Sequence, residues 1–203
     1  MLKKLFPPFQ YMNLPNGITF LAVAAGSTGL FLTLLDHYKL GLLVYALTFI
    51  LDVLDGMMAR KLNLQSQFGI QMDSIADFGN FCLIPAIFVF TFAQLNLWML
   101  LAMLPYIIAG AMRLAYYNLT GVVQEGNAVY YTGLPTTAAA MWVYIVMVFN
   151  RFIFPQYAAM LLSVGLLILT ALMVCKTHYR KHGFAFFLLL VFFTAAVALV
   201  VFT

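Results

Sequence analysis

Four of the six acidic residues in this chain are aspartates that stand close together in sequence, Asp52, Asp55, Asp73 and Asp77. They interrupt apolar sequence that otherwise has the character of membrane-spanning helix. An ionised carboxylate at membrane depth costs several kcal/mol unless a cation, a partner or water compensates it. Carboxylates gathered in this way would repel one another, so their placement predicts bound cations and a functional site.

The spacing of these residues predicts two acidic helix faces. The face of the first helix repeats at i, i+3, i+4 and i+7, and it joins two carboxylates to two residues of little bulk: Asp52, Asp55, Gly56 and Ala59. The face of the second helix repeats every four residues: Gly69, Asp73 and Asp77. A polar link joins the helices, and we expect them to be antiparallel neighbours that bring the carboxylates together.

Carboxylate oxygens in this number suit a hard divalent cation such as Mg²⁺, Mn²⁺ or Ca²⁺ rather than zinc. A pair of such ions would neutralise the aspartates while binding phosphate oxygens. Two-metal sites favour in-line displacement at phosphorus. The residues therefore predict a divalent metal cofactor, Mg²⁺ or Mn²⁺ and two ions in number, that serves phosphoryl chemistry.

The composition defines the elements that must position these residues. The chain has 203 residues, of which 65% are hydrophobic and 8% charged, and its mean hydropathy is +1.01. These values exclude a soluble domain and predict an all-α, polytopic integral membrane helical bundle that forms one domain over residues 1–203, with no nucleic-acid partner. Runs of spanning length predict about seven transmembrane helices, with six or eight as alternatives, at 17–36, 39–59, 69–93, 96–118, 134–150, 156–175 and 183–203.

The distribution of basic residues predicts the orientation. Most of the lysines and arginines fall on one side of the predicted bundle: Lys3, Lys4, Arg60, Lys61, Arg113, Lys176, Arg180 and Lys181. The positive-inside rule then places the N-terminus and the aspartates at the cytoplasmic face of a multi-pass cell-membrane protein. Prolines interrupt the N-terminal residues, which we interpret as a short retained interfacial segment rather than a signal peptide.

Residues 52–77 read D-x2-D-G-x2-A-R-x8-G-x3-D-x3-D, and they match every fixed position of the signature of the CDP-alcohol phosphotransferase family. The chain resembles that family. The resemblance implies that the two-metal centre is held by Asp52, Asp55, Asp73 and Asp77. It also implies that Asp77 is the general base that takes the proton of the acceptor hydroxyl.

The resemblance further implies a set of nucleotide-binding residues: Asn16, Thr19, Asp52, Gly56, Ala59, Arg60, Gly69 and Asp73. Gly56 and Ala59 match positions where cytidine approaches the helix backbone. Asn16 and Thr19 match a short P-N-x-x-T entry to the first helix. An alternative for Asn16 is purely structural, because asparagine is also a preferred residue for capping the start of a helix.

Three further runs resemble the phosphatidylserine synthase branch of the family, at residues 68–77, 113–118 and 133–140. This resemblance implies CDP-diacylglycerol and L-serine as substrates, CMP as a product, surrounding membrane lipids and a homodimer. The chain departs from the branch at four positions where an acceptor could be recognised, so serine is favoured over other acceptors but not fixed: Asn80, Cys82, Tyr116 and Thr137.

Arg113 is a basic residue well inside a spanning pattern, and its guanidinium could bind a serine carboxylate through two parallel hydrogen bonds. Two alternatives need no substrate: Arg113 as a counter-ion to the aspartates, or Arg113 reaching to the membrane interface. The loop at 120–133 either covers a polar substrate or only connects two helices.

Two alternatives remain open for the function. The same transfer could use another alcohol, namely glycerol 3-phosphate, an inositol phosphate or choline. Intramembrane carboxylates also line ion pathways, so a divalent-cation transporter is an alternative of a different class.

Overall fold

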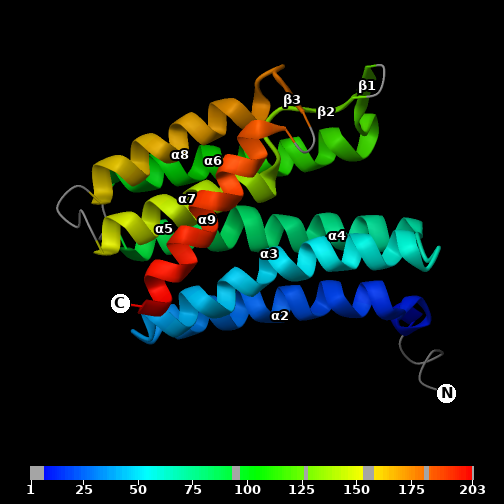
Figure 1. Cartoon of the computed structure of the whole chain (residues 1–203), viewed down its shortest axis with the longest axis horizontal. Helices are drawn as coiled ribbons and strands as arrows, with labels where there is room; N and C mark the ends of the chain where they lie inside the picture. Colours follow the sequence, from blue (N-terminus) through cyan, green and yellow to red (C-terminus); the bar gives the residue numbers. More distant parts are fainter. Residues whose placement is uncertain (1–6, 93–96, 126–127, 153–157, 181–182, 203) are drawn as a thin grey trace. The chain divides into compact units, whose positions relative to one another are not determined.

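The computed structural model describes residues 7–92, 97–125, 128–152, 158–180 and 183–202. This part of the chain is almost wholly helical, which confirms the all-α fold (Figure 1). A 3₁₀ helix, η1, precedes the α-helices. The bounds are η1 (Pro7–Tyr11), α2 (Leu14–Leu34), α3 (Tyr38–Lys61), α4 (Gln67–Phe78), α5 (Ile84–Phe92), α6 (Leu97–Thr120), α7 (Thr136–Phe152), α8 (Ala158–Val174) and α9 (Phe184–Phe202).

Six of the seven apolar runs coincide with one helix each. The run at 69–93 coincides with the span Gln67–Phe92, in which a π-helical segment, η2 (Gly79–Leu83), joins α4 to α5. Within the described residues, five helices are long and apolar enough to cross a membrane: α2, α3, the joined α4–α5, α6 and α9. Helices α7 and α8 have 17 residues each, or about 25 Å at 1.5 Å per residue. The chain is therefore a polytopic membrane bundle, as predicted.

The chain divides into two compact units, an N-terminal unit (Met1–Asn80) and a C-terminal unit (Phe81–Thr203). The single domain over residues 1–203 stays a prediction. Part of the predicted interfacial segment, with Lys3 and Lys4, lies outside the described residues, as does Lys181. The described part of that segment forms η1, whose residues are exposed.

In the N-terminal unit, α2 and α3 run side by side in opposite directions (Figure 1), and α2 also contacts α4. The approach of α2 to α3 is close because two glycines face each other. A Cβ atom built on Gly29 would lie 2.8 Å from the carbonyl oxygen of Gly41 and 2.8 Å from the backbone nitrogen of Tyr45. Glycine at this crossing lets the two backbones meet, as small residues do in membrane helix pairs.

Helix α2 begins at Asn13, not at Asn16. Asn13 has extended backbone dihedrals, and its side chain accepts a hydrogen bond of 2.9 Å from the Asn16 backbone N–H. Pro15 lies in the first turn, where its missing N–H leaves no helical bond unmade. The structural alternative that made Asn16 the helix cap is therefore wrong, because Asn13 already occupies that position.

The π-helical segment η2 directly follows the acidic face of α4. In the N-terminal unit, the buried Tyr45 hydroxyl donates a 2.7 Å hydrogen bond to the Asn80 carbonyl oxygen. In the C-terminal unit, the buried Tyr106 hydroxyl donates a 2.9 Å bond to the carbonyl oxygen of Phe81. A π-type turn disturbs the regular helical hydrogen-bond ladder, and here each unit supplies a tyrosine to a carbonyl of that turn.

The C-terminal unit packs α6 against α8, and α7 against α5, α8 and α9. It also contains a three-stranded antiparallel sheet of order β1-β2-β3, with β1 (Val123–Glu125), β2 (Ala128–Thr132) and β3 (His178–Arg180). This sheet, drawn at one end of the unit in Figure 1, joins the α6–α7 connection to the α8–α9 connection. The strands were not predicted from the sequence, which indicated only a loop at 120–133.

The Gly29–Gly41 crossing yields a prediction for stability. We expect Gly29→Ala to lower the thermal unfolding temperature of the purified protein in detergent, because the new methyl group meets backbone atoms that cannot move aside. Overpacking of this kind costs about 1–3 kcal/mol. Gly17→Ala on the same helix is the matched control, because a Cβ atom there meets nothing within 4 Å. Equal unfolding temperatures for the two variants would contradict the close approach.

Candidate functional site

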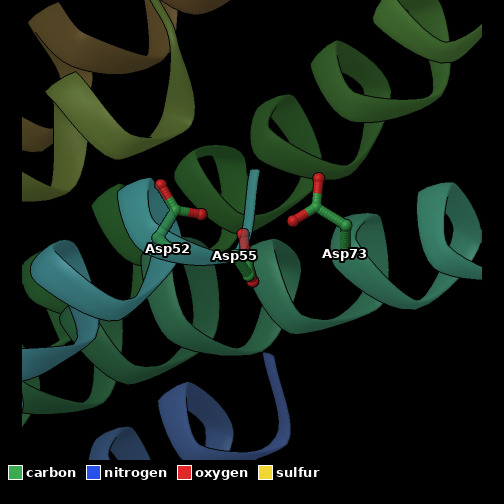
Figure 2. A group of neighbouring side chains, drawn as sticks. All are labelled: Asp52, Asp55 and Asp73. Atoms are coloured by element: carbon green, nitrogen blue, oxygen red, sulfur yellow. The ribbon is translucent and has the colours of Figure 1, made fainter. Parts of the chain in front are cut away.

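Three of the four predicted aspartates come together in the N-terminal unit. Asp52 and Asp55 lie on α3, Asp73 lies on α4, and one carboxylate oxygen from each lies within 4.8 Å of the others. Figure 2 shows the three side chains, with Asp55 between Asp52 and Asp73. Asp55 is buried, with 5% of its surface exposed, whereas Asp52 and Asp73 retain access to solvent. We call these three residues the acidic cluster.

The separation of these oxygens fits a divalent cation. Two oxygens on one Mg²⁺ ion lie at most about 4.2 Å apart, twice the usual Mg–O distance, and on one Ca²⁺ ion at most about 5 Å apart. The acidic cluster, within 4.8 Å, is therefore compatible with cation binding after at most a small contraction. It also leaves room for a ligand, because carboxylates from two helices fill only part of a metal's coordination sphere.

Asp77, the fourth predicted aspartate, adjoins the cluster. It lies one turn after Asp73 on α4, and its side chain is within hydrogen-bonding reach of Asp52. Ionised carboxylates only accept hydrogen bonds. The Asp52 and Asp77 carboxylates can therefore lie this close only if one of them is protonated or a cation lies between them. Asp77 lies outside the set of oxygens within 4.8 Å, so its position differs from that of the other three.

Thr19, predicted to bind nucleotide, is bonded to the acidic cluster. Its hydroxyl oxygen lies 2.6 Å from Oδ2 of Asp55 and 3.2 Å from the carbonyl oxygen of Pro15. A hydroxyl has a single proton to donate, and the shorter distance favours donation to Asp55. Thr19 thus fixes the most buried carboxylate of the cluster and directs its other oxygen.

Asn16 and Gly69 lie against each other. Asn16 is buried, and its side-chain amide donates a 2.8 Å hydrogen bond to the backbone oxygen of Tyr11. A Cβ atom built on Gly69 would lie 3.2 Å from Oδ1 of Asn16 and 3.2 Å from Oγ of Ser66, the N-cap of α4. Packing alone therefore explains a glycine at position 69, because it lets the start of α4 approach Asn16.

Gly56, Ala59 and Arg60 extend the same face of α3. Arg60 is exposed and its guanidinium folds back along the helix, so that a Cβ atom built on Gly56 would lie 3.4 Å from Nη1. The three atoms nearest to that position all belong to this flexible side chain. Packing within the protein therefore does not demand glycine at 56, in contrast to Gly69. Only the movable Arg60 side chain covers this glycine, next to Asp55 in sequence.

Arg113, the predicted acceptor-binding residue, belongs to the C-terminal unit. It is buried on α6, with 8% of its surface exposed, and its guanidinium lies over the rings of Tyr117 and Tyr131. Tyr117 stands four residues later on α6, a spacing that could have revealed the contact. Tyr131 comes from β2, and nothing in the local sequence indicated it.

Two further contacts near the acidic cluster were also missed. Tyr11 of η1 stacks on Phe68 of α4, with ring centres 4.5 Å apart and planes 9° from parallel. This stack joins η1 to the first turn of α4, close to the Asn16–Gly69 contact. Ser66 as the N-cap of α4 was detectable from the sequence, because a serine immediately before a helical run is a common start signal.

The architecture and the acidic cluster define an integral membrane protein with a carboxylate site at the ends of two consecutive helices. Comparison with known families gives the more particular result. The sequence model of the family described as CDP-alcohol phosphatidyltransferase matches residues 12–174. The chain therefore belongs to the CDP-alcohol phosphatidyltransferase family. This confirms the resemblance found in the sequence.

Several curated relatives carry the name CDP-diacylglycerol–serine O-phosphatidyltransferase. The protein of Bacillus subtilis (strain 168) is 33% identical over 138 residues, which cover 66% of this chain and 72% of that protein. The protein of Helicobacter pylori (strain J99) is 28% identical over 193 residues, 90% of this chain and 80% of the relative. The match to the Mycobacterium bovis protein is 33% identical over 133 residues, 63% of this chain, and spans only 46% of that relative's length.

The Thr19–Asp55 bond yields a prediction for metal affinity. We expect Thr19→Ala to weaken Mn²⁺ binding by roughly 10- to 100-fold, because residues that orient a metal ligand contribute this much. Thr19→Ser, which keeps the hydroxyl, should bind like the unaltered protein. Titration of the purified protein with Mn²⁺, followed by electron paramagnetic resonance of the free ion, measures the affinity.

Thr33→Ala is the matched control for this titration. Thr33 is also a buried threonine of α2 whose hydroxyl reaches the carbonyl four residues earlier, at 2.9 Å from Gly29. It stands fourteen positions further along the helix, and its hydroxyl bonds to the backbone of its own helix rather than to an aspartate. Equal losses of affinity in the Thr19 and Thr33 variants would show that the effect is not specific to Asp55.

Proposed function

We propose that this protein transfers the phosphatidyl group from CDP-diacylglycerol to L-serine and releases CMP. The observation that carries the proposal is the acidic cluster, in which three aspartates of the family signature lie within 4.8 Å of one another. The names of the relatives support serine as the acceptor. Family membership favours a transferase over the cation transporter that the sequence left open.

In the proposed reaction, the serine hydroxyl oxygen forms a bond to the phosphorus of the phosphatidyl group. The bond from that phosphorus to the oxygen shared with CMP breaks, and CMP leaves with that oxygen. Asp77 takes the proton of the hydroxyl as general base. Asp77 lies beside Asp52 and outside the acidic cluster, a position that is compatible with this role.

Asp52, Asp55 and Asp73 would bind two divalent cations, Mg²⁺ or Mn²⁺. Asp77 would be a further ligand. When bound, these cations neutralise the diphosphate and the departing CMP. Thr19 would hold the Asp55 carboxylate in its binding orientation through the 2.6 Å hydrogen bond. The same site would then be inactive once the metal is removed by a chelator.

The proposed binding residues differ for the two substrates. For the nucleotide we propose the helix face at Gly56 and Ala59, from which Arg60 can move aside. The other proposed nucleotide-binding residues are Asn16, Thr19, Asp52, Gly69 and Asp73. For the acceptor we propose Arg113, whose planar guanidinium matches a carboxylate through two parallel hydrogen bonds. A homodimer and an active site that faces the cytoplasm complete the proposal.

A direct assay tests the acceptor. We expect purified protein with CDP-diacylglycerol and Mn²⁺ or Mg²⁺ to release CMP when L-serine is added, and not with glycerol 3-phosphate, an inositol phosphate or choline. Asp77→Asn should lower this rate by about 100-fold or more, because general base catalysis contributes at least that much. Release of CMP and formation of phosphatidylserine are both measured.

Asp36→Asn is the control variant, because Asp36 lies in the exposed turn between α2 and α3 and accepts a hydrogen bond from the Tyr38 hydroxyl. It should retain full activity. Release with a different acceptor would keep the chemistry and reject serine. Failure to release CMP with any acceptor would reject the transferase.

Single cysteines test the orientation. In a background where Cys82 and Cys175 are replaced by serine, Asn63→Cys lies in the connection between α3 and α4, and Asp36→Cys lies at the opposite end of α3. We expect a membrane-impermeant maleimide to label position 36 in intact cells, and position 63 only after the membrane is opened. The reverse labelling would invert the proposed orientation.

A further inference from the structure

Helices α3 and α4 carry the acidic cluster, yet their backbones stay apart from each other. Within the described residues, α2 contacts both helices more extensively than α3 contacts α4. Side chains must therefore span the space between α3 and α4. The width of this space matters at the site, because two oxygens bound to one Mg²⁺ or Ca²⁺ ion lie at most about 4–5 Å apart.

Tyr45 of α3 bridges this space. Its hydroxyl donates a 2.7 Å hydrogen bond to the backbone carbonyl oxygen of Asn80, in the η2 segment that follows α4. Tyr45 is 1% exposed and Asn80 is 2% exposed, so water does not compete for this bond. Phe49, one turn further along α3, contacts the Tyr45 ring edge-on, with ring centres 5.5 Å apart and planes at 79°. The ring is held by its own helix while its hydroxyl reaches the next.

Pro85 explains why this carbonyl needs an outside donor. In a regular α-helix the N–H of residue 85 would bond to the carbonyl of Phe81, and in a π-type turn to that of Asn80. Proline has no N–H to donate. The same two carbonyls each accept a bond from a buried tyrosine instead. Tyr45 bonds to Asn80 in the N-terminal unit. Tyr106 bonds to Phe81 in the C-terminal unit, at 2.9 Å.

The Tyr45–Asn80 bond lies two helical turns from the acidic cluster. Tyr45 precedes Asp52 by seven residues on α3, and Asn80 follows Asp73 by seven residues. Seven residues bring a helix back to nearly the same face after about 10 Å. Because α3 and α4 run in opposite directions (Figure 1), the hydrogen bond and the carboxylates bridge the same pair of helices at two levels.

We infer that Tyr45 is a positioning residue for the metal site of the acidic cluster. Its hydrogen bond to η2 sets the distance between α3 and α4, and with it the distance from the α3 carboxylates to Asp73. Tyr45 touches no cation itself, because it lies two turns away and acts through the two helices. The inference rests on the divalent cations of the proposed function, and it does not depend on which alcohol is the acceptor.

Tyr106→Phe is the matched control for Tyr45→Phe. Each variant removes one buried hydroxyl that donates to a carbonyl of η2, and the two carbonyls are adjacent in the chain. Tyr106 belongs to α6, which carries none of the aspartates. A general disturbance of η2 would therefore affect both variants alike. A changed distance between α3 and α4 would affect only Tyr45→Phe.

The experiment compares metal affinity and stability in these variants. We expect Tyr45→Phe to weaken Mn²⁺ binding by roughly 3- to 10-fold, the factor that a lost buried hydrogen bond gives. Tyr106→Phe should bind Mn²⁺ like the unaltered protein. Titration of the purified protein with Mn²⁺, followed by electron paramagnetic resonance of the free ion, measures the affinity. Thermal unfolding with a chelator present should show similar losses of stability in the two variants.

The possible results separate this inference from the proposed function. If the unaltered protein binds no Mn²⁺, the metal site of the proposed function and the inference both fail. If it binds Mn²⁺ and Tyr45→Phe binds equally well, or Tyr106→Phe weakens binding to the same extent, only the inference fails. A protein that shows the expected Mn²⁺ affinities but releases no CMP with any acceptor would reject the proposed function alone.

A second variant covers the case in which Tyr45→Phe does not fold. Phe49→Leu removes the ring that holds Tyr45 edge-on and leaves the Tyr45 hydroxyl in place. It should weaken Mn²⁺ binding in the same direction as Tyr45→Phe. Unchanged Mn²⁺ affinity in Phe49→Leu would then overturn the inference.

Discussion

Negative charge concentrated inside an apolar helical unit is the constraint on which the rest of this structure depends. Two unit charges 4.8 Å apart repel by roughly 3 kcal/mol at an effective dielectric constant of about 20, and the acidic cluster holds three carboxylates within that distance. Neighbouring groups must hold these carboxylates, and protonation or a bound cation can offset the repulsion between them. The hydrogen bond from Thr19 to Asp55 is one such support.

Helix α2 provides much of the remaining support, although it carries none of the aspartates. It packs closely on α3 at the Gly29–Gly41 crossing and also contacts α4. At its N-terminal end, Asn16 lies against Gly69, and the preceding η1 stacks Tyr11 on Phe68. The first turns of α2 and α4 are thereby joined. The carboxylates of α3 and α4 come together because a third helix holds both.

Much of this arrangement could be predicted from the sequence because its signals are local. Apolar runs marked the seven helical spans, and the spacing of Asp52, Asp55 and Asp73 placed them on two helix faces that the structure brings together. What escaped prediction depends on contacts between distant residues. The three strands are only three to five residues long and carry no clear alternation, and Tyr131 reaches Arg113 through a pairing with residues nearly fifty positions later. The role of Thr19 in nucleotide binding stays a prediction, and its hydrogen bond to Asp55 was not foreseen, because the two residues are 36 positions apart.

The π-helical turn after Asp77 has a consequence for how chains of this kind can vary. Such a turn contains one residue more than the regular helix around it. Losing one residue between Gly79 and Leu83 would return the segment to regular α-helix and leave the faces on either side nearly in phase. Losing one residue between Asp73 and Asp77 would instead change the angle between these two side chains around α4 by about 100°. A change of length in this helix therefore keeps the acidic face intact only if it falls within the π-helical segment.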